Sequence, residues 1–374
     1  MTMEMDDLFT LPDSGLGWLD ASGPSSDIVL STRVRLARNL QGNAFGPRAR
    51  VQDRESVLER MKDSARKLTR LSGSSILEIP DVTPRIRKIL LERRLVSREL
   101  LGGDKATPQR GAAVILSSRD PLSILVNEED HLRLQSLLSG LRLHDGWDLV
   151  DRVDDELGEV LPFAFHQEFG YLTSCPTNVG TGLRASVLMH LPGLVLTKEI
   201  GKVLQGLNQV GLTFRGLYGE GSEVVGNFFQ VSNQTTLGKT EEDLVDHLDR
   251  LVRQVIQYER QARQVLMKEA PAETEDKIWR AYGLLRFARS LSFEEMINLL
   301  SGVRLGVGLK LLPELRVYTL NKIMIFSQRA HLEQAAGRDL PPPERDAHRA
   351  SFVRRILASE GVATSEDEDS SRGA

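Results

Sequence analysis

The sequence predicts an α+β fold in which a sheet with helices is followed by a mostly helical C-terminal part. Up to about residue 235, short apolar or β-branched runs come at the spacing of hairpins, as in 112–116 and 122–126. Beyond residue 240, apolar residues recur at helical spacing. Regular strand–helix alternation is missing, which favours a mixed or antiparallel sheet over a doubly wound parallel one.

The first half of the chain is expected to mix strands with amphipathic helices. Residues 1–26 lack periodicity and form a lead-in, from which Trp18 and Leu19 are expected to pack on the main domain. The elements expected after it are a strand over 27–34, helices over 51–71 and 84–95, a hairpin of 112–116 with 122–126, and helices over 131–141 and 145–157.

The second half contains two Gly-rich loops and then long helices. A strand over 170–175 enters the first loop, 176–182, and strands over 212–217 and 228–232 flank the second, 216–226. A helical pattern covers 194–210, and a long helix over 240–267 begins at Thr240, whose side chain can cap it. After a break at Pro271, residues 276–355 are helical with interruptions around 302–308, at Pro313 and at 341–343, and the acidic tail 362–374 is expected to be disordered.

Composition excludes several classes of protein. The 374 residues suffice for one large domain or two ordinary ones, and a net charge of -4 gives no support to a nucleic-acid or membrane-surface role. The single cysteine, Cys175, excludes an internal disulfide and a Cys-rich zinc site. Because no apolar stretch approaches the ~20 residues that span a bilayer and no signal pattern is present, we expect a cytoplasmic protein.

Familiar catalytic motifs are absent from the sequence. It has no GxxxxGK[ST] loop, no HRD or DFG kinase motif, no HExxH and no nucleophile elbow, and its seven His residues form no cluster of metal ligands. Only 11 of its 48 basic residues are lysines, so arginine dominates. Arg33 and Arg35 lie two apart on an expected strand and therefore point to the same face, where a polyphosphate could hold both. For this pair alone, a solvated strand face that carries the arginines by chance is the simpler explanation.

Three further segments join arginines to carboxylates or glycines. In 127–133, Asn127 resembles a helix cap and the acidic residues after it suit a first turn, but Glu129 could instead accept a proton or hold a guanidinium beside Arg133. In 173–186, Gly180 and Gly182 permit close backbone approach to a ligand and precede Arg184. Cys175, in the same segment, could be a small core residue or a thiolate in a polar site.

The fourth segment, 215–222, again joins an arginine, Arg215, to glycines and a carboxylate, Glu220. The four segments together supply five arginines, two Gly-rich loops and two carboxylates. Arginines can hold a phosphate chain and neutralise charge in the transition state, so the set suits phosphoryl transfer without a P-loop lysine. The metal implied is Mg²⁺, which prefers phosphate oxygens, water and few protein ligands.

The same segments resemble the catalytic domain of the phosphagen (guanidino) kinases. The wording is family-typical in STRVRLARNL (31–40), NEEDHLRLQSL (127–137), GYLTSCPTNVGTGLRASVLMHLPGL (170–194) and RGLYGEGSEVVGNFFQVSNQTTLGKTEEDLV (215–245). The chain looks still more similar to the bacterial protein-arginine kinases. Its catalytic segments begin close to the start of the sequence, its loop wording is that of the bacterial branch, and ERDAHRA (344–350) is similar to that group's phosphoarginine-binding motif RDxxRA.

The resemblance implies roles for individual residues. Glu129 and Glu220 would engage the acceptor guanidinium, with Glu129 as the base, and Cys175 would orient it. The residues implied to contact ATP are Ser31, Thr32, Arg33, Val34, Arg35, Arg133, Arg184, Ala185, Ser186, Val187, Leu188, Arg215, Gly216, Leu217, Tyr218, Gly219 and Glu220. An allosteric phosphoarginine site would consist of Arg345, Asp346, Ala347, His348, Arg349 and Ala350. The chain departs from the group at Arg94, where the relatives carry a His near the nucleotide.

The resemblance also implies a fold, a function and partners. We expect a curved antiparallel sheet flanked by helices over 27–265, a helical domain over 266–361, and a homodimer. The expected function is ATP- and Mg²⁺-dependent phosphorylation of protein arginines that marks proteins for a Clp-type chaperone-protease, with a small zinc-binding activator protein. The alternatives are a small-molecule guanidino kinase and a non-enzymatic phosphoarginine-reading adaptor on a degenerate kinase scaffold. Intact Glu129, Cys175 and Glu220 disfavour the adaptor.

Overall fold

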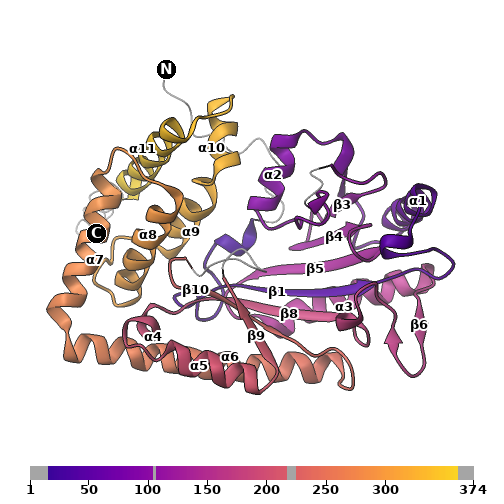
Figure 1. Cartoon of the computed structure of the whole chain (residues 1–374), viewed down its shortest axis with the longest axis horizontal. Helices are drawn as coiled ribbons and strands as arrows, with labels where there is room; N and C mark the ends of the chain where they lie inside the picture. The colour runs from indigo at the N-terminus through magenta and orange to yellow at the C-terminus, as the bar shows by residue number, and fades with distance from the viewer. Residues whose placement is uncertain (1–15, 104–106, 217–224, 361–374) are drawn as a thin grey trace, which may run out of the picture.

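A computed structural model describes residues 16–103, 107–216 and 225–360 (Figure 1). Within these ranges the chain forms an eight-stranded sheet in the order β2-β3-β4-β5-β1-β8-β10-β9, and every neighbouring pair in it is antiparallel. Its strands are β1 Val29–Arg38, β2 Ser75–Glu78, β3 Ala113–Leu116, β4 Leu122–Val126, β5 Leu132–Ser139, β8 Leu183–His190, β9 Leu212–Arg215 and β10 Phe228–Asn233. A separate ribbon pairs β6 (Phe165–His166) with β7 (Gly170–Tyr171). The predicted antiparallel sheet is confirmed.

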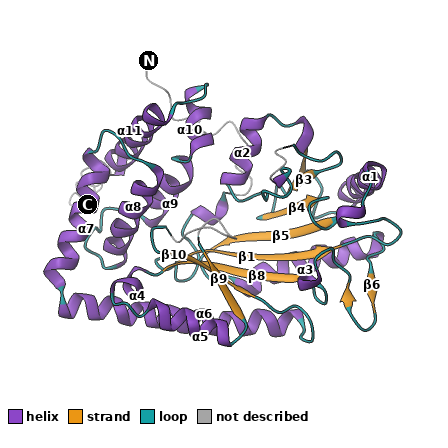
Figure 2. Ribbon diagram, in the orientation of Figure 1, coloured by secondary structure: helices purple, strands orange, loops and turns teal. Residues whose placement is uncertain are grey.

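Helices cover the sheet and then form the C-terminal part (Figure 2). Those up to residue 269 are α1 Val51–Lys67, α2 Pro84–Glu92, α3 Leu143–Val160, α4 Pro192–Leu196, α5 Ile200–Gln209 and α6 Glu241–Glu269. The C-terminal helices are α7 Pro271–Phe287, α8 Phe293–Gly308, α9 Val317–Phe326, α10 Arg329–Ala336 and α11 Pro342–Glu360. As predicted, Thr240 caps α6, with its hydroxyl accepting from the Asp243 N–H at 3.1 Å. Among the described residues, no helix has the length and apolar character needed to cross a membrane.

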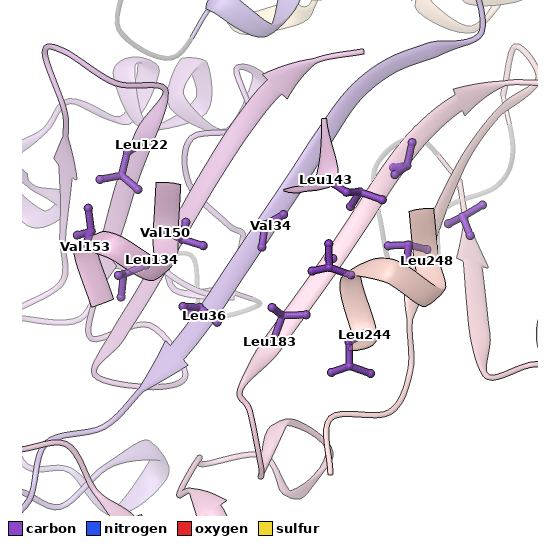
Figure 3. Close-up of a cluster of buried hydrophobic side chains, with 14 of the residues drawn as sticks. Val34, Leu36, Leu122, Leu134, Leu143, Val150, Val153, Leu183, Leu244 and Leu248 are labelled. Atoms are coloured by element: carbon purple, nitrogen blue, oxygen red, sulfur yellow. The ribbon is translucent and has the colours of Figure 1, made fainter. Parts of the chain in front are cut away.

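Two large hydrophobic cores lie on different parts of the sheet. The first packs α1, α3 and α6 against one face, where Val34 and Leu36 of β1 meet Val150 of α3 and Leu244 of α6 (Figure 3). The second is built around the C-terminal helices and takes in Trp18, Leu19 and Leu30 together with side chains of β5, β8 and β10. The packing expected for Trp18 and Leu19 is therefore observed, and it attaches the C-terminal helices to the sheet.

The helix predicted over 131–141 is wrong, because these residues form β5. This strand pairs with β4 on one side and β1 on the other. Both of its faces are largely buried, because side chains of β5 enter both large cores. A strand buried on both faces loses the polar–apolar alternation of a half-exposed strand, and its apolar spacing then imitates a helix. The Asn127 cap is wrong for the same reason: Asn127 lies in the β4–β5 turn at φ +56°, and its side-chain amide donates to the carbonyls of Arg54 and Gly111 at 2.8 Å each.

Three other boundaries differ from the prediction. The interruption expected around 302–308 is absent because α8 runs through it: a Cβ on Gly306 would lie 2.5 Å from Ile278, so the glycine lets α7 and α8 approach closely. The helical pattern over 194–210 is two helices, α4 and α5, separated at Lys198, whose φ is +62°. The strand expected over 170–175 is limited to β7, and the remainder is loop.

A buried arginine ties the sheet to two helices. Arg38, at the end of β1, has only 1% of its side chain exposed and pairs with Asp154 of α3 at 2.7 Å and with Glu241 of α6 at 3.2 Å. It also donates to the Thr181 carbonyl at 2.7 Å and lies over the Tyr171 ring, 3.5 Å from its centroid. These contacts fix the loop after β7 against the end of β1.

Replacing Asp154 by Asn is expected to lower the free energy of unfolding by about 3 kcal/mol, because it leaves the buried Arg38 with a single carboxylate. Urea unfolding at neutral pH measures the change. Asp155→Asn, an exposed neighbour on the same helix, should change stability by less than about 0.5 kcal/mol. Equal midpoints for the two variants would contradict the importance of this pair.

Candidate active site

The candidate site begins with arginines on one face of the sheet. Because side chains alternate along a strand, Arg33 and Arg35 project from the face opposite Val34 and Leu36, as predicted. Arg35 lies directly across from Arg184 of β8, and Arg133 of β5 lies across from Ala37. The sheet thus brings four of the predicted arginines onto one surface.

The fifth arginine, Arg215, is farther along the same sheet. It is paired with Gln230 of β10, the residue that faces Leu188 on β8. The side chain of Gln230 is also within 3.4 Å of the Arg94 guanidinium, an arginine that comes from the end of α2 rather than from the sheet. The structure therefore connects the Arg215 edge to the central cluster through Gln230.

Crowding of like charges perturbs the central arginines. Burial lowers the pKa of Arg33 to about 9, with the positive charges of Arg94, Arg133 and Arg184 adding to the effect and Glu128 opposing it. Burial also holds the pKa of Arg35 well below its usual range, again with help from Arg33, Arg133 and Arg184. The Arg35 Nε is buried and has no hydrogen-bond partner within the described residues. A bound polyphosphate would supply both the missing acceptor and the missing negative charge, so these residues fit such a ligand.

Two members of this site were not identified from the sequence. The Glu128 carboxylate is fully buried and binds both Arg133 and the Ser97 hydroxyl, so it is the cluster's internal counter-charge. The sequence marks Arg94 only as a departure from the relatives. In the structure its charge is close enough to depress the pKa of Arg33. Its backbone has φ +65°, which turns the chain after α2 toward the sheet.

Glu129 lies at the edge of the arginine cluster. It sits in the β4–β5 turn, with 42% of its side chain exposed, and its carboxylate is 3.6 Å from the Arg133 guanidinium. Burial raises the pKa of Glu129, Asp130 and Glu128 raise it further, and Arg133 opposes them. A carboxylate with a raised pKa is a better proton acceptor than an ordinary one, which suits it to general base catalysis.

Cys175 is held beside the Glu129 turn by a buried polar network. Ser174 donates from its hydroxyl to the Glu129 carbonyl and from its N–H to the Asp130 carboxylate, both at 2.7 Å. Asn39, at the end of β1, donates to the same carboxylate at 2.7 Å and to the Leu172 carbonyl at 3.0 Å. The partly exposed Cys175 Sγ is 3.0 Å from the Thr177 hydroxyl. The residue before Cys175 is therefore hydrogen-bonded to the backbone of Glu129.

The glycines of this loop serve the fold. A Cβ on Gly180 would lie 2.3 Å from the Thr236 carbonyl, and one on Gly182 would lie 2.6 Å from that of Ala37. Both residues have positive φ. Their close backbone approach, predicted to be toward a ligand, is toward the chain's own backbone.

The other residues predicted to contact nucleotide differ in position. Ser186 lies across from Arg33 on the arginine face. Thr32 donates to the Gly140 carbonyl at 2.7 Å, and Ser31 is buried. The side chains of Val34, Ala185 and Val187 are buried in the first core, on the face opposite the arginines. Leu188 is on the arginine side of β8 but is buried in the second core. Gly216 directly follows β9. The structure does not describe the remaining four, Leu217, Tyr218, Gly219 and Glu220.

The predicted phosphoarginine motif lies near the start of α11. The Arg349 guanidinium is 2% exposed, pairs with Asp346 at 2.5 Å and donates to the carbonyls of Ser327 and Leu291. Glu344 pairs with Arg338, and Ala350 is buried in the second core. Arg345, Ala347 and His348 are partly or fully exposed on the same helix. Asp346 and its neighbours thus lie at the surface around one buried arginine.

A direct contact joins the C-terminal helices to the segment that leads into Arg94. The Glu92 carboxylate, at the end of α2, accepts from the N–H groups of Ala330 and His331 at 2.8 and 3.2 Å, at the start of α10. The His331 ring contacts it at 2.7 Å through Nδ1, and Arg93 lies 3.3 Å from Nε2. The next residue is Arg94, so α10 contacts the segment that carries a guanidinium of the site.

Comparison with known proteins agrees with this geometry. Residues 56–262 match the C-terminal catalytic domain of the ATP:guanido phosphotransferases, and residues 271–370 match the C-terminal domain of the protein-arginine kinase McsB. Lombricine kinase is a structural neighbour with a TM-score of 0.57 and 25% identity, over 67% of this chain and 71% of that one. A taurocyamine kinase from Schistosoma mansoni has a TM-score of 0.54 and 26% identity, over 69% of this chain and 35% of its own.

Relatives with the name protein-arginine kinase match almost the whole chain. The one from Symbiobacterium thermophilum is 46% identical over 345 residues, which cover 91% of this chain and 96% of the relative. The one from Bacillus velezensis is 41% identical over 362 residues, which cover 96% of this chain and 98% of the relative. The chain therefore belongs to the protein-arginine kinase family and carries the catalytic domain of the ATP:guanido phosphotransferases.

Proposed function

We propose that this protein transfers the γ-phosphoryl group of ATP to arginine side chains of proteins. The observation that carries the proposal is the group of partly buried, electrostatically crowded arginines with Glu129 and Cys175 at its edge. Family membership supports the same reaction. The arginines suit the phosphate chain, and the carboxylate and thiol suit a guanidinium acceptor.

In this proposal the residues divide the work by position. Arg33, Arg35, Arg133 and Arg184 hold the phosphates and neutralise charge that develops during transfer. Glu129 binds the acceptor guanidinium, aims one nitrogen at the γ-phosphorus and accepts its proton. The N–P bond forms as the bond from the γ-phosphorus to the bridging oxygen breaks and ADP leaves. Mg²⁺, when bound with ATP, neutralises phosphate charge. No cluster of three His, Cys, Asp or Glu residues that could hold a metal occurs in the described ranges, which is compatible with an ion held mainly by the nucleotide.

One assay distinguishes this function from its closest competitor. The protein is incubated with ATP, Mg²⁺ and casein, and acid-labile phosphate is located by mass spectrometry. We expect phosphate on arginine side chains. A small-molecule guanidino kinase, to which the similarity with lombricine kinase lends some support, would instead phosphorylate free guanidines and leave casein unmodified. Such a result would contradict the proposal.

We further propose that residues 345–350 bind phosphoarginine and stimulate the kinase. The Asp346 carboxylate suits a guanidinium, and the neighbouring cations suit its phosphate. The contact of Glu92 with the start of α10 offers a physical connection to Arg94 and the nucleotide site.

Asp346→Ala is expected to leave basal casein phosphorylation unchanged and to remove any stimulation by added phosphoarginine. Initial rates with and without phosphoarginine, together with its affinity from calorimetry, measure the effect. Asp339→Ala, an exposed carboxylate before α11, is the matched control and should respond like the wild type. An unchanged phosphoarginine affinity in the Asp346 variant would exclude this site.

The wider setting follows from the same proposal. We propose a cytoplasmic homodimer with a catalytic domain over 27–265 and a helical domain over 266–361. A small zinc-binding activator and a Clp-type chaperone-protease that receives the marked proteins are its proposed partners. Size-exclusion chromatography with light scattering tests the dimer directly.

A further inference from the structure

A groove lies beside the ribbon of β6 and β7. Figure 1 shows β6 at the end of the molecule opposite the C-terminal helices. We call this groove the ribbon groove. It has a volume of about 490 Å³ and runs between the ribbon and the segment that leads into α6. Its lining includes Phe165, Glu168, Phe169, Tyr171, Leu237 and Lys239.

The ribbon groove exposes more apolar surface than a solvated loop requires. Phe165 is 53% exposed, Phe169 is 47% exposed, and Leu237, on the other wall, is 51% exposed. Large apolar side chains that gather around one hollow are typical of a binding surface, whereas scattered single ones are not.

The walls are held in place before any ligand arrives. The Phe165 ring packs edge-on against Tyr171 at 5.2 Å between centroids, and His166 stacks on Phe169 at 4.9 Å. Tyr171 in turn lies under the buried Arg38 guanidinium. A preformed site loses less conformational entropy on binding, so even a modest apolar contact can contribute affinity.

The ribbon groove adjoins the loop that carries Cys175. Tyr171 and Gly180, both in its lining, are paired through backbone hydrogen bonds of 2.8 and 3.3 Å, and Cys175 lies on the chain between them. Three residues lie between Tyr171 and Cys175, so their Cα atoms are at most about 14 Å apart. A polypeptide whose arginine reached Cys175 and Glu129 could therefore place neighbouring residues in the groove.

The charges around the ribbon groove favour a basic occupant. Glu168 and Asp243 line it against the single cation Lys239, and Glu241, also in the lining, is already paired with Arg38. The adjoining helix α3, which reaches Glu241 through the Trp147 indole at 3.1 Å, carries further carboxylates at Asp148, Asp151 and Asp155. Complementary charge of this kind selects partners and accelerates their encounter.

We propose that the ribbon groove binds the residues that flank the target arginine in an extended segment of the substrate protein, and that it prefers flanks that combine an apolar with a basic side chain. The proposal rests on the protein-arginine kinase function proposed above and names the substrate feature that the enzyme reads. A free guanidino compound would have no use for this surface, because it has no flanking residues.

Peptide binding tests the proposal without depending on catalysis. Two fluorescein-labelled peptides with one arginine each are compared by anisotropy, one with Leu and Lys flanks and one with Gly and Ser flanks. We expect the wild type to bind the Leu–Lys peptide about tenfold more tightly. The double variant F165S/F169S should lose this preference and bind both peptides equally. Leu237→Lys, a single change on the opposite wall, should do the same and guards against misfolding of the ribbon.

The controls separate this proposal from the function itself. Leu196→Ser with Val265→Ser removes two exposed apolar side chains outside the groove lining and should keep the preference. The groove variants could lose the preference while the wild type phosphorylates neither peptide. That result would support the groove proposal and refute the kinase assignment. If the wild type and all variants phosphorylated both peptides and bound them with equal affinity, the kinase function would stand and the groove proposal would be refuted.

Discussion

Glu129→Gln is expected to lower kcat for arginine phosphorylation by about 10²–10⁴-fold, while ATP binding changes little. A guanidinium is protonated at neutral pH, so it attacks phosphorus only as a proton leaves. Glutamine keeps the shape of the side chain but cannot accept that proton. The position of Glu129 at the edge of the arginine cluster, rather than within it, explains why nucleotide affinity should persist. Rapid-quench kinetics and calorimetric titration with ATP measure the two quantities.

The pH profile gives this variant a second readout. The base must be ionised to act, and its pKa is raised by burial and by Asp130 and Glu128. Activity of the wild type should therefore fall as pH drops through a value above the ordinary range for glutamate, and E129Q should lose this acid limb along with the rate. Glu159→Gln, on the exposed end of α3, should retain both. If E129Q kept the acid limb and a normal rate, another group would be the base.

The sequence predicted the local chemistry of the site better than the elements that carry it. The alternation of Arg33 and Arg35 with Val34 and Leu36 is local, so their shared face followed from strand geometry alone. The hairpin of β3 and β4 followed from its turn residues. In contrast, β5 was predicted as a helix, because a central strand is defined by partners that lie far along the chain. The apolar spacing of β5 does not indicate which strands it pairs with.

Glu128 shows the same limit within the site. From the sequence it was one of three adjacent acids, and nothing local distinguishes it from Glu129. In the fold it is fully buried beneath Arg133, whereas Glu129 is 42% exposed. The β4–β5 turn determines which acid is the counter-charge and which one is the proposed base. The helix predicted over this segment contains no such turn. The choice of Glu129 as the base comes from the family resemblance, and it stays a prediction.

Arg94 was unpredictable for a different reason. It is not on the sheet at all but follows α2, and a left-handed backbone brings it to Gln230 and Arg33. Contacts between segments that are over a hundred residues apart cannot be inferred from spacing. The contact of Glu92 with α10 is of the same kind, because it joins two helices that are far apart in the sequence.

Arg35→Met is expected to change stability and nucleotide binding in opposite directions. The folded protein holds the pKa of Arg35 below its unfolded value, chiefly by burial and then by the charges of Arg33, Arg133 and Arg184. A cation with a depressed folded pKa destabilises the fold fully wherever the pH is below that pKa. The penalty falls as the pH rises above it and is gone only above the unfolded pKa. At neutral pH, removal of the charge should therefore raise the free energy of unfolding of the nucleotide-free protein, by about 1 kcal/mol.

The same change should weaken ATP binding by about 10–100-fold, the equivalent of losing one charge-assisted phosphate contact. Thermal unfolding with and without ATP reports both effects: the variant should melt later than the wild type when empty and gain less when nucleotide is added. Inorganic tripolyphosphate should reproduce the pattern, because the cluster acts on phosphates. Arg66→Met, which removes a 70% exposed arginine from α1, should alter neither quantity. A variant that was less stable when empty would mean that Arg35 serves the fold, and the argument from crowded charge to polyphosphate binding would lose its main support.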